Sequence, residues 1–462
     1  MSFPITWTTT SLSEVCTKIV DGSHNPPKAV ENGFPMLSAK NIYKRKVFFD
    51  DYRLISKEDF EIENNRTNIS SGDVLLTIVG AIGRGAVVNE GLDKFTLQRS
   101  VAVLKPFQIN PKYLSYALEA PKLQKYLQDN AKGTAQKGIY LKALSAVTIP
   151  LAPLNEQRRI ADKLDTTLAR VDALNDRLAR ITPLLKRFRQ SVLAAATSGR
   201  LTEDWRQNKD ISTFSWKAIT EFREQILPDL PNSWKWVEFS EVASVQSDLR
   251  DPSEYQNEIH LAPNHIEPWS GKISGCQTIA DDAVKSPKHW FNAGQIVYSK
   301  IRPNLCKVAI PNFSGLCSAD MYPISTKLND SYLLLWMLGE RFTSWASNAE
   351  SRTVLPKINT KELGKIPVPV TSAEEQTEIV RRVEILFAFA DRLEARLQSA
   401  QTAAERLTPA LLAKAFRGEL VPQDPSDEPA AELLRRLREA RAADTASKPK
   451  RGRAAKAPTV SE

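Results

Sequence analysis

The sequence lacks several features that would place it in familiar classes. No stretch of its 462 residues approaches the ~18 consecutive apolar residues of a membrane helix, since the longest candidate is the short run YLLLWMLG. The first residues, MSFPITWTTT, lack the basic start and the apolar core of a secretory signal. The four cysteines, at positions 16, 276, 306 and 317, show no Cys-x-x-Cys spacing. These absences favour a cytoplasmic protein whose cysteines are ordinary buried thiols.

Motifs for catalysis and metal binding are also missing. The four histidines have no HExxH spacing and no paired cysteines, so no metal site is expected. No GxxxxGK[ST] sequence occurs. GAIGRG (80–85) has the wrong glycine order for a dinucleotide fingerprint and predicts a hairpin or a close backbone approach to a phosphate. HNPPK (24–28) resembles part of the Asn-Pro-Pro-aromatic motif of adenine methyltransferases, but Lys28 stands where the aromatic residue would. The chain is therefore predicted to be non-catalytic, with no cofactor of its own.

What the sequence has is an excess of positive charge. Sixty-three Lys and Arg residues against 54 Asp and Glu residues give a net charge of +9 and a pI near 9.2. With 42% hydrophobic and 25% charged residues, the chain has a globular composition, and its length indicates two or three domains. The charge makes a polyanion such as nucleic acid a candidate partner.

The sequence also contains an internal repeat. Glu156-Gln157 recurs 219 residues later as Glu375-Gln376, and the same offset relates Pro150 to Pro369 and Gly199 to Gly418. Upstream the match is looser: Trp7 pairs with Trp234 at an offset of 227, and SGDVLLT (71–77) pairs with AGQIVYS (293–299) at 222. A drifting offset followed by a fixed one predicts that each half is a variable globular domain followed by a helix of constant length.

The two helical segments carry apolar residues at heptad spacing. Their equal length favours pairing with each other as an antiparallel coiled coil, with the two halves related by a pseudo-two-fold axis. Two unrelated amphipathic helices, each packed on its own domain, remain the alternative. The helix-pairing positions are Ile160, Leu164, Val171, Leu174, Leu178, Ile379, Val383, Leu386, Ala390, Leu393 and Leu397. Thr182-Pro183 predicts a break or kink in the first helix, after a straight run of roughly 40 Å from Asn155.

The predicted fold class is α+β, with two globular α/β domains joined by the two long helices. The expected boundaries are domain 1 at 1–152, the first helix at 153–201, a linker at 202–230, domain 2 at 231–371, the second helix at 372–420 and a tail at 421–462. Within the linker a short helix is expected near 216–226. In the tail, AELLRRLREARAAD predicts an exposed helix, and the basic end after it predicts disorder.

Polar loops in both halves supply candidate DNA contacts. Base edges are read by Arg, Lys, Asn and Gln, and phosphates are bound by Lys, Arg, Ser and Thr. Any one of these residues is more often a solvated surface group than a contact. The candidates are Ser23, His24, Asn25, Lys28, Lys40, Asn41, Lys44, Arg45, Arg84, Gln98, Arg99, Thr134, Gln136 and Lys137 in domain 1, and Asn264, His265, Lys300, Arg302, Asn304, Arg352, Thr353, Lys357 and Asn359 in domain 2.

Several quoted segments resemble the specificity (S) subunits of type I restriction–modification systems. They are IPLAPLNEQRRIADKLDTTLARVD with its counterpart IPVPVTSAEEQTEIVRRVE, together with LSAKNI, KGTAQKGIYLKALS, SKIRPN and GLCSADMYPI. The resemblance covers about residues 7–422, and LLKRFRQSVLAAATSGRLTEDWR is most similar to the IA class. The second helix departs from the first, because it lacks the basic LKRFRQ run.

The resemblance implies that each domain is a target-recognition domain that reads one half of a split site in double-stranded DNA. It also implies that the helices set the spacer and dock two adenine-N6 methyltransferase (M) subunits, which hold S-adenosylmethionine. Motor-nuclease (R) subunits would use ATP and Mg²⁺. Two alternatives remain, a stand-alone DNA-modifying enzyme with an unrecognised site and a structural coiled-coil protein.

Overall fold

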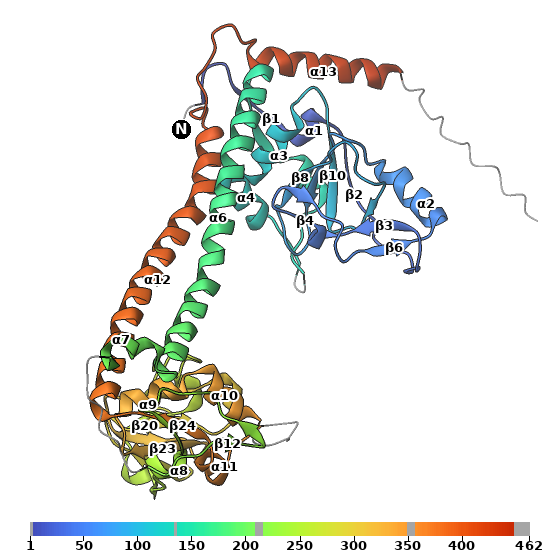
Figure 1. The fold of residues 1–462 in the computed structure, drawn as a ribbon. Coiled ribbons are helices and arrows are strands. Elements are labelled where there is room, and N and C mark those ends of the chain that lie inside the picture. The colour runs from blue at the N-terminus through green and yellow to red at the C-terminus, as the bar shows by residue number, and fades with distance from the viewer. Residues whose placement is uncertain (1–2, 134–135, 208–215, 349–355, 448–462) are drawn as a thin grey trace, which may run out of the picture. The chain divides into compact units, whose positions relative to one another are not determined.

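The structure is a computed structural model that describes residues 3–133, 136–207, 216–348 and 356–447. The chain forms two compact units, unit 1 with Met1–Arg177 and Ala400–Glu462, and unit 2 with Leu178–Ser399. Each unit contains one globular domain and one part of each long helix (Figure 1). Among the described helices, none is long and apolar enough to cross a membrane. The expected α+β class is confirmed.

Domain 1 is built on two sheets. The larger contains, in spatial order, β2 (Cys16–Asp21), β10 (Val101–Pro106), β7 (Val74–Thr77) and β8 (Gly85–Val87). The smaller contains β6 (Arg53–Ile55), β3 (Phe34–Leu37) and β9 (Thr96–Leu97), and two-stranded pairs join β1 (Thr8–Ser11) to β11 (Thr148–Leu151) and β4 (Ile42–Tyr43) to β5 (Lys46–Val47). The helices are α1 (Leu12–Val15), η1 (Ala39–Asn41), α2 (Lys57–Thr67), α3 (Pro111–Glu119), α4 (Pro121–Asp129) and α5 (Leu141–Ser145). The GAIGRG segment connects β7 to β8, as the predicted hairpin.

Domain 2 repeats this plan. Its four-stranded sheet contains β15 (Ala243–Val245), β23 (Met321–Thr326), β20 (Ile296–Ser299) and β21 (Val308–Ala309). Its second sheet contains β16 (Leu249–Arg250), β19 (Lys288–Phe291), β22 (Gly315–Cys317), β17 (Ile259–Leu261) and β18 (Gln277–Thr278), and β14 (Lys235–Glu238) pairs with β24 (Pro367–Val370). The helices are α8 (Phe239–Val242), η3 (Pro252–Glu254), η4 (Pro263–His265), η5 (Pro303–Leu305), α9 (Asp330–Met337), α10 (Glu340–Ser347) and α11 (Thr360–Gly364). The strands β16 and β19 extend the second sheet beyond the domain 1 plan.

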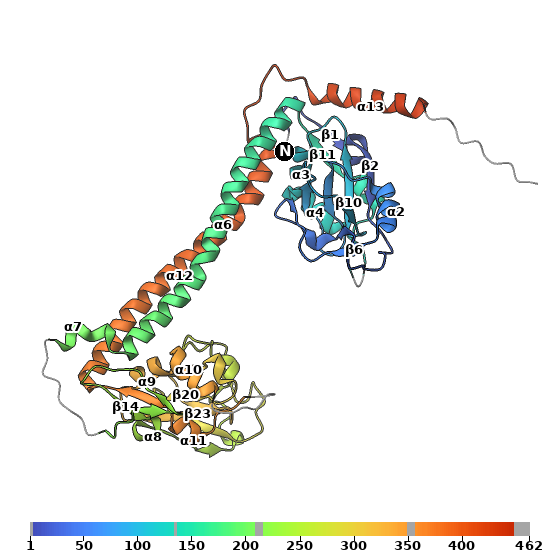
Figure 2. The same ribbon diagram turned by 45° about the vertical axis from the view of Figure 1, so that its right-hand side comes forward.

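The two long helices have nearly the same length, as the repeat predicts: α6 (Leu154–Thr197) has 44 residues and α12 (Ala373–Ala415) has 43. In unit 2, Arg189 of α6 contacts Asp391 and Glu394 of α12, at 2.9 and 3.0 Å. Further along the chain, Asp204 contacts Arg382 at 2.6 Å. Because one sequence number rises while the other falls, the helices pair antiparallel there (Figure 2).

Most of the predicted pairing positions are buried or half-buried, but two expectations about α6 are wrong. The break at Pro183 is wrong, because the helix continues through it, whereas the alternative of a kink stays a prediction; α12 likewise contains Pro409. Both prolines face solvent, and each removes one backbone hydrogen bond at a cost of ~3 kcal/mol inside a helix. Leu174 is 40% exposed, so it is not a buried position of the helix seam.

The junction between each domain and its helix repeats contact by contact. The indole of Trp7 donates to Glu156 at 2.9 Å, and that of Trp234 donates to Glu375 at 2.9 Å. The same offset of 219 relates two further contacts. The side-chain oxygens of Gln157 and Gln376 accept the backbone N–H of Asn110 and Asn329, and the hydroxyls of Tyr113 and Tyr332 donate to the carbonyls of Pro150 and Pro369. The repeat in sequence is therefore a repeat of buried polar contacts.

The linker after α6 differs from its prediction. Where a helix was expected near 216–226, the chain forms a hairpin of β12 (Glu221–Phe222) and β13 (Gln225–Ile226) after the short η2 (Arg200–Thr202) and α7 (Glu203–Arg206). Arg223 and Glu224 both have positive φ, at 51° and 61°, which closes a two-residue turn. Packing of this segment on domain 2 overrides the helical propensity of its residues.

The tail forms the predicted helix, α13 (Ala430–Ser447), but that helix is not fully exposed. Leu433, Leu434 and Leu437 are buried in the core of unit 1. Arg438 pairs with Glu14 at 2.8 Å, and Figure 1 shows α13 near α1 and β1 of domain 1. The residues after 447, where disorder was expected, lie outside the described part of the chain.

Candidate nucleic-acid interface

Two of the predicted contacts are structural caps. Asn41 is fully buried at the end of η1, and its Oδ1 accepts the backbone N–H of Ser38 at 3.0 Å. His265 occupies the matching place at the end of η4, and its Nδ1 accepts the backbone N–H of Ala262 at 3.1 Å. Both side chains hold the turn that follows the core strand of their sheet. The prediction that they read DNA is therefore wrong.

A second group attaches each domain to its long helix. Arg45 forms ion pairs with Asp172 of α6 and, at 3.8 Å, with Glu119. Lys44 contacts Asp176 at 3.1 Å. In unit 2, Asp391, the repeat counterpart of Asp172, accepts from Lys272 at 3.3 Å. Arg45 is thus held by the helix, whereas Lys44 keeps an exposed ammonium group, and a DNA contact by either stays a prediction.

Glu119, which pairs with Arg45, has a raised pKa. Burial raises the pKa of Glu119 to about 7, although the Arg45 guanidinium and a backbone hydrogen bond from Gly85 act in the opposite direction. The carboxyl therefore changes its charge near neutral pH. The junction between domain 1 and α6 is a titratable contact, and this was not foreseen from the sequence.

Two more candidates have structural roles. Ser23 is buried, and its hydroxyl donates to Glu63 at 2.6 Å. Asn359 caps α11, where its Oδ1 accepts the backbone N–H of Glu362 at 2.8 Å. Among the remaining candidates, Asn25 and Lys28 are exposed, Lys40 pairs with Asp51 at 2.6 Å, and Gln98 is half-buried. Thr134, Arg352 and Thr353 lie outside the described residues.

The structure brings several domain 1 candidates together. His24, Arg99 and Gln136 line one cavity of about 470 Å³, which also contains Lys132 and Arg66. The backbone N–H of Arg99 donates to the carbonyl of Ser23 at 2.8 Å, so their two loops are in contact. Asp21 lies in the same cavity and accepts from His24 at 2.7 Å. The result is a concave, mostly cationic surface with exposed guanidinium and amide groups.

The loop that carries Gln136 and Lys137 rests on the β7–β8 hairpin. Lys132 and Gly138 pair as an antiparallel bridge that closes this loop, and the carbonyl of Lys137 accepts from Gly80 at 3.0 Å. Arg84, at the end of the same hairpin, has an exposed side chain. The hairpin and the loop therefore form one surface with the cavity.

Domain 2 repeats the hairpin and its backbone contacts to residues 356–357. The bridge between Val79 and Gly138 recurs as a bridge between Ile301 and Lys357. The backbone N–H of Arg302 donates to Pro356 at 2.8 Å, which matches the bond from Gly80 to Lys137. Arg302 thus takes the place of a glycine and has a φ of 46°, a conformation that is strained for a residue with a side chain.

The other domain 2 candidates lie around this hairpin or on η4. Asn304 and Asn264 are exposed, the ammonium of Lys300 lies 5.1 Å from the centre of the Tyr322 ring, and Lys357 pairs with Asp320 at 3.2 Å. Of these, Arg302 and Asn304 are the candidates that the structure presents most openly on the same turn.

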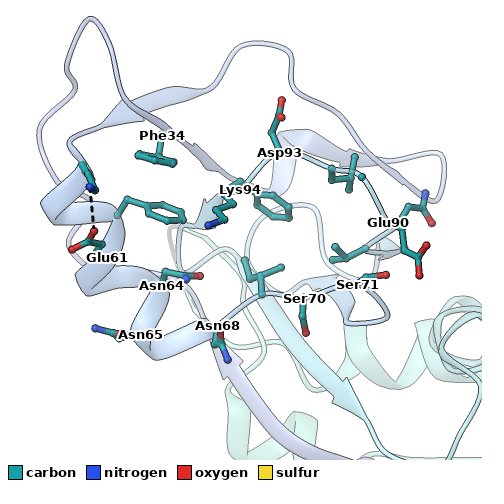
Figure 3. Close-up of a pocket in the computed structure, with 18 residues that line it drawn as sticks. Phe34, Glu61, Asn64, Asn65, Asn68, Ser70, Ser71, Glu90, Asp93 and Lys94 are labelled. Carbon is teal, nitrogen blue, oxygen red and sulfur yellow. Dashed lines mark ion pairs between the residues drawn. The ribbon is translucent and has the colours of Figure 1, made fainter.

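A further cavity in domain 1 was not foreseen. It has a volume of about 540 Å³ and lies between α2 and residues 88–95 (Figure 3). Its wall carries the carboxylates of Glu61, Glu90 and Asp93 and the amides of Asn64, Asn65 and Asn68. The amide-rich run ENNRTN was the available signal in the sequence. Because three carboxylates face two lysines there, this cavity does not extend the cationic surface.

Comparison with known proteins places these features in a family. Residues 4–182 and 231–400 match the family of the type I restriction modification DNA specificity domain. The chain is 47% identical over 369 residues to the type I restriction enzyme EcoDI specificity subunit of Escherichia coli, covering 78% of this chain and 83% of that protein. It is 30% identical over 387 residues to the EcoBI specificity subunit of the same species, covering 79% of this chain and 78% of that protein.

Solved structures agree with the fold. A chain from a study of complex assembly and conformational transition of the type I R-M system aligns with a TM-score of 0.63 at 18% identity, covering 91% of this chain and all of that chain. The HsdS subunit from Thermoanaerobacter tengcongensis aligns with a TM-score of 0.53 at 19% identity, covering 91% and 99%. The chain belongs to the family of type I restriction–modification specificity subunits.

Proposed function

We propose that the chain is a non-catalytic subunit in which each domain reads one half of a bipartite, asymmetric DNA site. The observation that carries the proposal is the recurrence of one cationic hairpin and loop on both domains. In each case the same backbone bonds hold the turn, while the exposed side chains differ, with Arg84, Arg99 and Gln136 in domain 1 and Arg302 and Asn304 in domain 2. An identical framework with different side chains is what two readers of different sequences require.

We further propose that α6 and α12 fix the distance between the half-sites and dock two adenine-N6 methyltransferase subunits. The near-equal helix lengths and the repeated junctions support a spacer of defined length. S-adenosylmethionine would be held by the methyltransferase subunits, and ATP and Mg²⁺ by motor-nuclease subunits.

The recognition role is tested by single-molecule sequencing of DNA from cells that express this chain with its methyltransferase partner, scored for N6-methyladenine. We expect a split motif that disappears when this chain is deleted. Methylation that persists at the same motif without the chain would contradict the proposal, because the partner would then find its own targets.

The ruler role is tested by deleting seven residues from α6 alone, between positions 166 and 178. A heptad deletion keeps the apolar face in phase but shortens one helix by roughly 10 Å. We expect a changed spacer preference or loss of assembly with the methyltransferase. A matched deletion of seven residues in the tail beyond position 447 is the control, and an unchanged spacer with full methylation after the α6 deletion would contradict the ruler.

A further inference from the structure

An apolar groove in unit 1 corresponds to a groove in unit 2 that the chain itself fills. The unit 1 groove has a volume of about 810 Å³ and lies between α4, the β1–β11 pair and the end of α12. The residues that carry the argument are Thr9, Ala117, Tyr126, Ile149, Ala413 and Phe416. Tyr126 is 39% exposed, although its ring lies in an apolar surface.

In unit 2 the linker hairpin occupies the corresponding place. The ring of Phe222 packs on Trp345 with centroids 5.3 Å apart. The indole of Trp236 donates to the carbonyl of Pro228 at 2.8 Å, and the backbone N–H of Ile219 donates to the carbonyl of Trp236 at 2.9 Å. The hairpin thus covers the aromatic wall and also adds a hydrogen bond to the edge of β14.

The repeat relates the two grooves residue by residue. Trp336 and Trp345 stand 219 positions after Ala117 and Tyr126 of the unit 1 groove, and Trp236 stands 227 positions after Thr9. The chain that follows α12 does not mirror the linker. It leads into α13, which packs near α1 and β1 (Figure 1). Among the described residues of unit 1, the groove remains open.

We propose that the unit 1 groove is a docking site for an extended segment of a partner protein. The occupant carries aromatic and aliphatic side chains on one face, as the linker hairpin does, and one backbone N–H that reaches the carbonyl of Thr9 at the edge of β1. Three cations line the groove: Lys122, Lys125 and Arg417. Since Lys125 pairs with Asp129 at 3.8 Å and Arg417 with Glu419 at 2.7 Å, the charge of Lys122 remains to attract an occupant with a net acidic charge. The tail of this chain, KPKRGRAAK, is basic and does not meet that requirement.

The first test uses a fluorescent peptide with the sequence of residues 216–230, WKAITEFREQILPDL, as the probe, added to the full chain. We expect saturable one-to-one binding, measured by anisotropy. Ala413→Trp fills the groove from the surface of α12 and should weaken binding at least tenfold. Ala410→Trp, on an exposed position of the same helix, is the matched control and should leave binding unchanged. Tyr126→Ala provides a second variant at a partly exposed position, in case Ala413→Trp does not fold.

The peptide could instead exchange with the linker in unit 2. In that case Trp345→Ala, and not Ala413→Trp or Tyr126→Ala, would weaken binding, and this result would overturn the proposal. The absence of saturable binding at millimolar peptide, or equal binding by all unit 1 variants, would overturn it as well.

The second test places a photo-crosslinking benzoylphenylalanine at position 126 of the full chain, in complex with its methyltransferase subunit. We expect a crosslink to the partner, on a segment that contains an aromatic residue. A crosslink only to this chain or to a second copy of it, or none in an intact complex, would overturn the proposal. This arm relies on the proposed assembly, whereas the peptide arm does not, so failure of assembly and failure of the groove are distinguished.

Discussion

The two units share their buried framework and differ in the side chains that are exposed on it. A tryptophan donates to the junction glutamate in both units, Trp7 to Glu156 and Trp234 to Glu375. The caps at Asn41 and His265 occupy matching turns of the two domains. By contrast, domain 2 extends one sheet by two strands, and its hairpin carries Arg302 where domain 1 has Gly80. A domain of this kind separates stability from specificity, because buried polar contacts hold the fold while exposed turns are free to vary.

The largest expected effect comes from the two junction glutamates. Glu375 accepts from Trp234, Thr202, Thr371 and the guanidinium of Arg206, the last at 2.5 Å, and is fully buried. Glu375→Ala leaves a mostly buried guanidinium unpaired and should destabilise unit 2 by about 3–5 kcal/mol.

Glu156 has the neutral partners Trp7 and Gln423, so Glu156→Ala should destabilise unit 1 by about 1–3 kcal/mol. Hydrogen-exchange mass spectrometry measures the two units separately in each variant. Equal losses in the two units would show that the charged partner adds nothing to the shared junction.

The next effect is a pH dependence of unit 1. Since the folded pKa of Glu119 is about 7 and the unfolded one is near 4.3, the folded state binds the proton more tightly. Its contribution to stability is present at low pH and is lost as the pH rises through 7. Between pH 5 and pH 8 the loss should be about 2–3 kcal/mol. Protection of domain 1 amides, compared between the native chain and Glu119→Gln, measures this. If the two show the same pH slope, Glu119 is not the titrating group.

Replacing the glycine after each long helix by alanine should destabilise both units to the same extent. Gly199 and Gly418 have φ of 78° and 77°, and an added Cβ would lie 2.5 Å from Pro231 and 2.3 Å from Pro4. Substitution by alanine should cost about 2 kcal/mol or more in each unit. Gly294→Ala is the control, with a φ of 81° and no atom within 4 Å of the added Cβ, and should cost about 1 kcal/mol. Thermal unfolding compares the three variants. If Gly199→Ala or Gly418→Ala loses no more stability than Gly294→Ala, the nearby proline must move to make room for the added Cβ.

The smallest expected effect is an acid sensitivity of the His265 cap that the Asn41 cap lacks. Burial lowers the pKa of His265 below its usual value, so its contribution is present above about pH 6.5 and is lost as the pH falls. Protonation of Nδ1 also removes the acceptor for Ala262. His265→Asn copies domain 1 and should remove this acid sensitivity, with a change in stability below about 1 kcal/mol at pH 7.5. Exchange of the Ala262 amide between pH 5 and pH 7.5 is the measurement, and a native-like acid response in the variant would assign the sensitivity elsewhere.

How far the sequence predicts the structure depends on whether a contact is local. The repeat offsets predicted equal helices and matched domains because the same residues recur in register. The heptad spacing predicted the buried positions of the two helices, apart from Leu174, and their equal length favoured antiparallel pairing. The continuation of α6 through Pro183 was not predictable, because it depends on packing against distant residues. The same holds for residues 216–226, whose propensity is helical but which pack on domain 2, where the ring of Phe222 contacts Trp345.

The candidate site shows the same limit. Arg99 and Arg302 are exposed, so the prediction that they contact DNA stays open. Asn41 and His265 are buried, and residue type alone does not reveal that a side chain turns inward. Arg45 is bound by an aspartate 127 positions away, which no local pattern encodes.

We propose that each domain reads its own half-site. The most direct measurement is an exchange of residues 234–371 for the matching domain of the EcoDI relative, followed by mapping of N6-methyladenine in cells that contain the methyltransferase subunit. We expect a methylated motif in which one half-site changes, while the other half-site and the spacer stay the same. A motif that changes in both halves, or in neither, would contradict independent reading by the two domains.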